Sequence, residues 1–219
     1  MISKELVQEK FREIQESICS ALSAESGREF REDQWDYESG DGGGITRIST
    51  GDVIEKGGVN YSALSGNLSE KISSKLKGGN ARDFYAVGVS LVIHPQNPFV
   101  PTVHMNIRYL ERGEKQWFGG GIDLTPCYTV KSDIITFHKK LRSVCDKHDP
   151  AYYSEFKRKC DEYFFIKHRN EARGVGGIFF DYLSDDLEKT FQFVLDVGNT
   201  FKSLYIPFLS SYKKKTYSE

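Results

Sequence analysis

The sequence predicts an α+β protein with a largely antiparallel, flat, multi-stranded sheet and helices on both faces of that sheet. Two observations lead to this class. Segments rich in Val, Ile, Tyr and Thr fill the middle of the chain, and segments with helical periodicity lie at both ends and between the later strands. The 219 residues suffice for one sizeable core. We therefore expect residues 1–219 to form a single domain.

Charge and cysteine content limit the class of protein further. The chain has 30 Lys and Arg against 31 Asp and Glu, a formal charge of -1, so no basic field indicates a nucleic-acid partner. No apolar run approaches the roughly 20 residues of a membrane-spanning helix. The 4 cysteines form no CxxC pair and favour a reducing compartment. With an acid-rich, amphipathic N-terminal run, these features predict a cytoplasmic protein.

The first third of the chain predicts one helix and two short strands. Apolar residues at helical spacing predict a helix over residues 2–23. The glycine-rich run Ser39–Gly44 predicts a loop, followed by a strand over 45–49. Gly57 and Gly58 predict a break before a strand over 59–62. Residues 65–83 are expected to form an exposed connection that is partly helical over 68–76.

The segments 84–94 and 100–111 predict an antiparallel hairpin around a proline-containing turn. A loop over 95–99 would pair His94 with Val100 and place Ser90 opposite His104. Because side chains alternate along a strand, the even-numbered residues of both strands should share one face. The polar members of that face are Ser90, His94, His104, Asn106 and Arg108.

The second half predicts one more pair of strands and three helices. A strand over 116–124 carries Gly119–Gly121 and then Asp123, a pattern typical of close approach by a ligand or another backbone. Ser132 can cap the next helix, and apolar residues at every fourth position extend a second helix from Phe156 to His168. A strand follows over 178–181. The last helix starts at Asp185 and Glu188, which have capping-box spacing, and ends near Pro207 and the lysines at 213–215.

The polar hairpin face is the main candidate site. An arginine such as Arg108 offers a planar fork for a carboxylate, and a histidine such as His104 can exchange protons near neutral pH. Asp123, directly after the glycines, could accept hydrogen bonds from ligand N–H groups or act as a base. These observations predict a ligand that bears carboxylates. An ordinary solvated outer face, with Asp123 as a turn residue, is the alternative.

Several other residues have both an ordinary and a functional interpretation. His138 and His168 fall on apolar helix stripes, where each could be a buried core histidine or could join His94 and His104 as a metal ligand. The spacing alone supports the metal only weakly, since no HxH or HExxH pattern is present. Arg173, before the run Gly174–Gly177, could hold an anionic group or simply precede a turn.

Four long segments in fixed order resemble the oxygen-dependent coproporphyrinogen III oxidases. The resemblance extends from Trp35 and Gly42–Gly44, through Glu55–Asn60, to the last helix. The segments that carry it most clearly are Ser90–Pro95, Pro101–Tyr109, Trp117–Pro126 and Lys167–Gly177.

The resemblance implies oxidative decarboxylation of two propionates of coproporphyrinogen III to vinyl groups with dioxygen, which gives protoporphyrinogen IX in haem biosynthesis. It implies that His104 donates a proton, that Asp123 engages the pyrrole N–H groups, and that Arg173 lies near the substrate. The substrate-binding positions that it implies are Ser90, Asn106, Ile107 and Arg108. No organic cofactor is implied, and no flavin or nicotinamide motif is present.

The resemblance implies a metal only for one branch of the family, and it implies a homodimer when the family's C-terminal segment is present. In the bacterial branch of the family the residues that match His94, His104, His138 and His168 are assigned to a divalent metal, whereas other members are described as needing none. Members of the family form homodimers and continue beyond the last helix, so we expect this chain to lack the family's C-terminal segment. Two alternatives remain open at this stage: a His-ligated metal oxygenase, and a non-catalytic tetrapyrrole-binding module.

Overall fold

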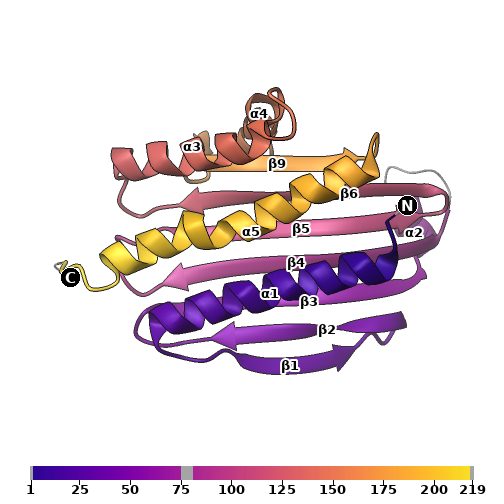
Figure 1. Ribbon diagram of the computed structural model, residues 1–219, viewed down its shortest axis with the longest axis horizontal. Helices are drawn as coiled ribbons and strands as arrows, with labels where there is room; N and C mark the ends of the chain where they lie inside the picture. The colour runs from indigo at the N-terminus through magenta and orange to yellow at the C-terminus, as the bar shows by residue number, and fades with distance from the viewer. Residues whose placement is uncertain (1, 75–80, 218–219) are drawn as a thin grey trace.

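The computed structural model describes residues 2–74 and 81–217 and contains one seven-stranded antiparallel sheet. Its strands lie side by side in the order β1-β2-β3-β4-β5-β6-β9 (Figure 1). A small two-stranded sheet pairs β7 with β8. The strand bounds are β1 Arg31–Asp36, β2 Gly40–Ser49, β3 Ile54–Asn67, β4 Asp83–Pro95, β5 Thr102–Arg112, β6 Lys115–Thr125, β7 Phe165–Ile166, β8 Glu171–Ala172 and β9 Gly176–Leu183.

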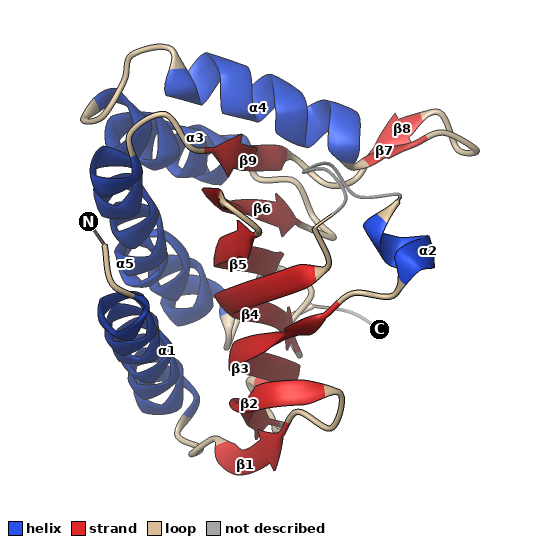
Figure 2. Ribbon diagram, turned by 90° about the vertical axis from the view of Figure 1, so that its right-hand side faces the viewer, coloured by secondary structure: helices blue, strands red, loops and turns tan. Residues whose placement is uncertain are grey.

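The long helices cover one face of this sheet. Helix α1 (Lys4–Ser26) packs on β3 and β4, and α5 (Leu187–Tyr212) packs on β5 and β6. Helix α3 (Lys131–Asp146) lies beside α5, and α4 (Tyr152–Tyr163) runs along β9 at one end of the sheet. Figure 2 shows that the short α2 (Glu70–Ser73) and the β7-β8 hairpin lie on the other side. The α+β class is confirmed, with most of the helical cover on one face.

The core forms where the odd-numbered side chains of β4 and β5 meet the helices. Val89 and Ile107 on the sheet, and Phe11 and Phe201 on the helices, are completely buried. Each fully buried side chain of this size stabilises the fold by about 1.5–3 kcal/mol relative to its exposed state. The even-numbered residues of the same strands point to the opposite face, as the alternation predicts.

A close contact between α1, α5 and the sheet forms at Gly198. A Cβ atom at this position would lie 2.9 Å from Ile14 Cδ1 and 3.0 Å from Ile107 Cδ1. Gly198→Leu should therefore overpack the core and lower the free energy of unfolding by about 3 kcal/mol. Urea denaturation measures this change. Asn199→Leu, on the exposed side of the same helix, serves as the control and should stay within about 0.5 kcal/mol of the parent protein; equal losses in both variants would contradict the packing argument.

In the first third of the chain, two glycine-rich segments predicted to interrupt strands lie within strands instead. Residues 40–44, expected in a loop, belong to β2, which pairs with β1 on one side and β3 on the other. Gly57 and Gly58, expected to interrupt a strand, lie within β3 and pair with Ile93 and Val92. The expected helix over 68–76 is reduced to α2 in the described part, and its last two residues lie outside the described residues. Backbone pairing on both sides outweighs the weak strand preference of glycine here.

The predicted hairpin is confirmed, but its register was wrong by two residues. Ser90 pairs with Asn106, and Val92 pairs with His104, because the connection spans residues 96–101 rather than 95–99. A shift of two leaves every side chain on its predicted face, since alternation along a strand has a period of two.

The helix ends differ from the predictions at three places. Ser132 does not cap α3, whose N-cap is Val130 without a side-chain hydrogen bond. Helix α5 is capped by Asp186, which accepts a hydrogen bond from the Lys189 N–H, and it continues through Pro207 to Tyr212. Helix α4 stops at Tyr163, so His168 does not lie on it. The chain instead turns back over residues 167–170 to pair Phe165 with Ala172.

The cysteines are all free, and they differ in burial. Burial raises the pKa of Cys19 to about 11 and the pKa of Cys145 and of Cys160 to about 12, whereas Cys127 is exposed. Because the thiolate is the reactive form, one thiol per chain should react rapidly with an aromatic disulfide reagent at pH 8, and the other three should react only after unfolding. Cys127→Ser should abolish the rapid reaction; a second fast thiol would contradict the described burial.

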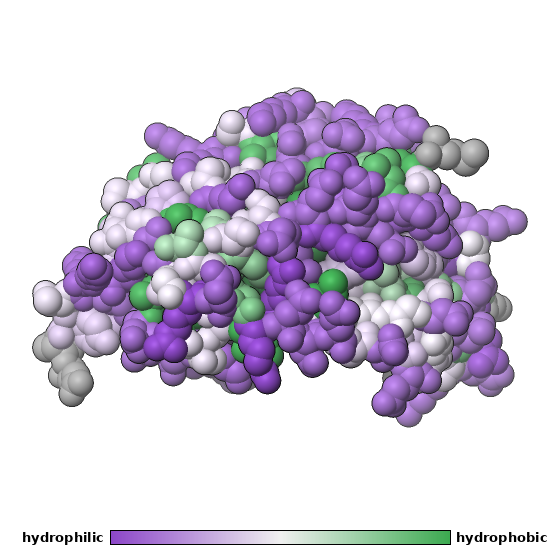
Figure 3. Space-filling model, turned by 60° about the horizontal axis from the view of Figure 1, so that its bottom comes forward, coloured by the Kyte–Doolittle hydropathy of each residue, from purple (hydrophilic) through white to green (hydrophobic). Residues whose placement is uncertain are grey.

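The surface around the β1 edge of the sheet is mainly hydrophilic. Figure 3 shows hydrophobic residues on this side as scattered small patches rather than one broad area. Among residues 2–74 and 81–217, none of the helices is both long and apolar enough to span a bilayer.

Candidate active site

A cavity of about 370 Å³ lies on the sheet face opposite the long helices. Strands β3 to β6 and β9 form its floor, and residues at the end of α4 form a wall. Its polar and charged lining residues are Asn60, Ser90, His104, Asn106, Arg108, Asp123 and Arg173. Four of the five predicted polar strand residues therefore lie on the floor of a cavity, and His94 is not among the residues that line it.

The carboxylate of Asp123 is the most deeply buried charge of this cavity. Its residue is 3% exposed, and one nitrogen of Arg173, Nη2, donates to both of its oxygens at 2.9 Å. His104 Nδ1 lies 3.6 Å from Asp123 Oδ2, because His104 and Asp123 are partners in the β5-β6 register. A buried carboxylate with a cation and an imidazole beside it can accept and return protons.

An aromatic wall holds Arg173 in place. The guanidinium carbon of Arg173 lies 3.7 Å from the ring centroid of Phe164, a distance typical of a cation–π contact. Tyr163 stacks on Phe179 across the same wall, with ring centroids 4.4 Å apart. Arg173 Nε and His104 Nδ1 are buried without a hydrogen-bond partner among the described residues. Buried polar atoms without a partner are rare in folded proteins, and a catalytic role is one reason for keeping them.

Arg108 forms a second polar cluster at the other end of the cavity floor. Its Nη1 donates to Asn106 Oδ1 at 2.9 Å, and its Nη2 lies 2.9 Å from Asp181 Oδ2 on β9. Ser90 and Asn60 are partners in the β4-β3 register and line the cavity beside this cluster. The cavity thus contains the guanidinium of Arg108 together with the imidazole of His104 and the carboxylate of Asp123.

Of the predicted catalytic and substrate-binding residues, all except Ile107 line this cavity. The side chain of Ile107 is completely buried on the helix-covered face, so only its backbone can contribute to ligand binding. Asp181, Phe164 and Asn60 were not among the predicted site residues. Alternation along 178–181 could have placed Asp181 on the polar face, whereas nothing in the sequence indicated that Phe164 stacks on Arg173.

The four histidines proposed as metal ligands do not converge. His94 and His104 lie with ring centroids 6.4 Å apart, but His168 is exposed in the turn of the β7-β8 hairpin. Both ring nitrogens of His138 are already engaged at 3.0 Å, with the Val175 carbonyl and the Tyr153 hydroxyl, and burial lowers its pKa. Within the described residues, no group of three or more His, Cys, Asp or Glu side chains could hold a metal ion. The donor set therefore does not fit a four-histidine centre.

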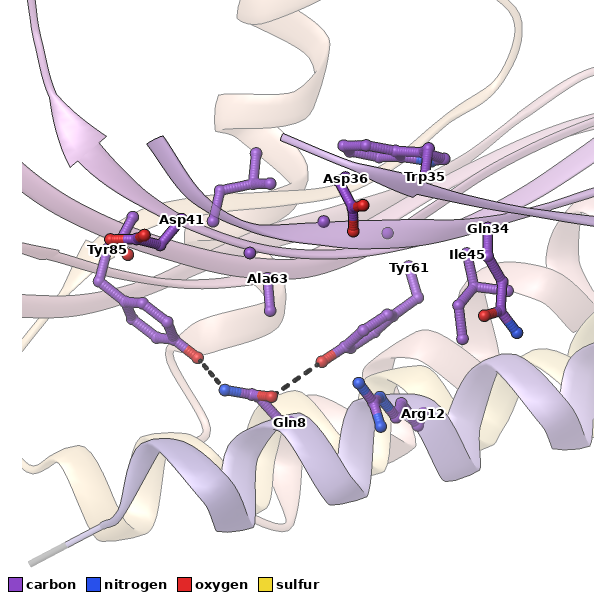
Figure 4. Close-up of a pocket in the computed structure, with 15 residues that line it drawn as sticks. Gln8, Arg12, Gln34, Trp35, Asp36, Asp41, Ile45, Tyr61, Ala63 and Tyr85 are labelled. Carbon is purple, nitrogen blue, oxygen red and sulfur yellow. Dashed lines mark hydrogen bonds between the residues drawn. The ribbon is translucent and has the colours of Figure 1, made fainter. Parts of the chain in front are cut away.

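A larger cavity of about 700 Å³ lies on the helix side, between α1 and the β1-β2 end of the sheet. In Figure 4, Gln8 links two tyrosines across it: its amide donates to the Tyr85 hydroxyl at 3.0 Å and accepts from the Tyr61 hydroxyl at 3.5 Å. Burial raises the pKa of Tyr85 to about 12, so this hydroxyl stays protonated near neutral pH. Because no histidine of residues 2–74 and 81–217 lines this cavity, the smaller one on the opposite face is the better candidate for proton-transfer chemistry.

The fold and the smaller cavity define an α+β protein with a cluster of arginine, histidine and aspartate side chains on the open face of an antiparallel sheet. Comparison with known proteins identifies the family. The coproporphyrinogen III oxidase family model matches residues 6–219, and the chain belongs to that family. The sequence is 48% identical to the oxygen-dependent coproporphyrinogen-III oxidase of Drosophila melanogaster over 94% of this chain and 56% of that protein.

Two relatives from other organisms carry the same family name. The chain is 42% identical to the oxygen-dependent coproporphyrinogen-III oxidase of Dictyostelium discoideum, over 99% of this chain and 73% of that protein. It is also 42% identical to the protein of the same name from Coxiella burnetii, over 95% of this chain and 70% of that protein. The sequence thus spans a little over half of the Drosophila protein and about seven tenths of the other two.

Proposed function

We propose that this chain carries out the oxygen-dependent conversion of coproporphyrinogen III to protoporphyrinogen IX. The observation that supports this most directly is the buried pair of Asp123 and Arg173 beside His104, in the same cavity as the Arg108 fork. This arrangement can bind carboxylates and exchange protons, and both are required to act on a tetrapyrrole that carries propionates.

Each propionate would lose carbon dioxide, two electrons and one proton to become a vinyl group. Dioxygen, as co-substrate, accepts the electrons. Arg108 and Asn106 would hold a propionate carboxylate, Asp123 would accept hydrogen bonds from pyrrole N–H groups or take one of their protons, and His104 would deliver or remove protons at the reacting edge. The aromatic wall at Phe164 would exclude water from Asp123.

The proposal includes no organic cofactor and assigns no step to a metal. A His-ligated metal oxygenase has less support, because the histidines that it would need are spread between the cavity, the end of β4, α3 and the β7-β8 turn. Elemental analysis of the purified protein before and after chelation tests this point. Loss of turnover on chelation, with recovery on adding one metal, would favour the metal oxygenase.

Product analysis tests the proposed reaction. The folded protein is loaded with coproporphyrinogen III without oxygen, the reaction is started with oxygen, and the porphyrins are separated after oxidation. Protoporphyrin together with released carbon dioxide is the expected result. Binding of the tetrapyrrole without any vinyl product would instead identify a non-catalytic binding module.

A homodimer and a cytoplasmic location complete the proposal. The resemblance to the family supports the dimer, and the free cysteines are compatible with a reducing compartment. Light scattering on the purified chain tests the oligomeric state, and fluorescence imaging of a tagged protein tests the location. A monomer at all concentrations would contradict the dimer for this chain.

A further inference from the structure

Arg108 is already engaged by an internal carboxylate. Its side chain is 29% exposed and that of Asp181 is 26% exposed, and Arg108 Nη2 lies 2.9 Å from Asp181 Oδ2. The other terminal nitrogen, Nη1, donates to Asn106 Oδ1. Because a carboxylate is the ligand that the guanidinium fork binds best, Asp181 occupies the position that a ligand carboxylate would take.

Gly119 makes this ion pair possible. It is the partner of Arg108 in the β5-β6 register, and the ion pair between Arg108 and Asp181 crosses β6 directly above it. A Cβ atom at Gly119 would lie 2.4 Å from Asp181 Oδ1 and 2.8 Å from Arg108 Nε. Any residue with a side chain would therefore push the two charged groups apart.

Asp181 is anchored independently of Arg108. The backbone N–H of Tyr182 donates to Asp181 Oδ1 at 3.0 Å, so the carboxylate keeps one partner when the arginine leaves. Tyr182 holds this geometry with a left-handed φ of 58°, which is uncommon for a residue other than glycine. Its ring stacks on Trp117, with centroids 5.2 Å apart, at the register shift between β9 and β6.

Arg108 also separates two cavities. It lines both the candidate active-site cavity and a neighbouring cavity of about 220 Å³, and Asp181 borders the smaller one. The arginine can thus turn toward a ligand in the larger cavity while Asp181 stays in the smaller one. The change requires a side-chain movement and no rearrangement of the sheet.

We propose that Asp181 determines the affinity of the site for carboxylate ligands by competing with them for Arg108. A ligand binds through Arg108 only by displacing Asp181 or sharing the fork with it. The inference rests on the proposed function, since it assumes a ligand that bears carboxylates. It assigns to Asp181 a role in binding and none in the chemical step.

Asp181→Asn is the decisive variant. The amide keeps an oxygen that can accept a hydrogen bond from Arg108, but it removes the competing charge. The probe is coproporphyrin III, the oxidised tetracarboxylate, which cannot undergo the reaction. We expect Asp181→Asn to bind it roughly 3- to 10-fold more tightly at low salt, consistent with the modest strength of a partly exposed ion pair. The KM for coproporphyrinogen III should fall with little change in kcat.

Asp52→Asn is the matched control, since it makes the same charge change at a side chain that is 94% exposed in the β2-β3 connection. It should bind the probe like the parent protein.

Equal or weaker binding by Asp181→Asn, at unchanged melting temperature, would overturn the inference, as would an equal gain in Asp52→Asn. If neither the parent nor Asp181→Asn binds the probe, the inference and the proposed ligand class both fail. Tighter binding by Asp181→Asn without any vinyl product would support the inference and refute only the proposed activity.

Discussion

Asp123→Ala is expected to lower kcat for vinyl formation by about 10³-fold, within the range that a positioned acid or base contributes. The variant should still fold, because Arg173 is 30% exposed and can be hydrated once its partner is removed. Binding of coproporphyrin III should weaken less than kcat falls, since Arg108 remains to hold a carboxylate. The measurement is initial rate in an anaerobically loaded, oxygen-started assay.

Asp33→Ala provides the control for this experiment. Asp33 is an exposed acid on the edge strand β1, five strands from the strand β6 that carries Asp123, and its removal should leave turnover within about twofold. Asp123→Asn separates shape from charge, because the amide fills the same space without serving as a base. Near-normal turnover by Asp123→Ala would show that Asp123 takes no part in the reaction.

The faces of the central strands could be predicted from the sequence because alternation depends only on residue parity. His104, Asn106 and Arg108 share a face whatever the register, so a register predicted two residues off did not move any of them to the other face. The same reasoning failed for β1. All six of its residues are exposed, and an edge strand of this kind lacks the apolar alternation that identifies a strand.

The contacts that give the site its chemistry could not be predicted. Asp123 and Arg173 are 50 residues apart in the chain, and they meet because β9 pairs with β6 at Asp123 and Gly177. Periodicity describes one element at a time and gives no information on which elements become neighbours. The extension of α4 to His168 failed for a related reason: an apolar repeat every fourth residue persisted in the sequence past the point where the chain turns into β7.

Arg173→Leu is expected to lower the free energy of unfolding by about 2–3 kcal/mol. The loss comes from Asp123, whose side chain is 4% exposed and would stay buried without its cation. This loss is smaller than the usual cost of breaking a fully buried pair because Arg173 is itself partly exposed, and because His104 lies 3.6 Å from the carboxylate. Urea denaturation at neutral pH measures the change. Arg173→Lys should fall between the parent and the leucine variant, since a lysine keeps the charge but cannot stack flat on Phe164.

A double-mutant cycle separates the ion pair from simple loss of packing. Removing both charges in Asp123→Leu/Arg173→Leu leaves no uncompensated carboxylate, so the double variant should be more stable than Arg173→Leu alone. A coupling of at least about 1.5 kcal/mol between the two positions is expected from their direct contact. Additive losses would mean that Asp123 tolerates burial without Arg173. The negative charge of Asp123 would then be compensated by His104 or by water. Arg173 would be free to bind a ligand carboxylate directly.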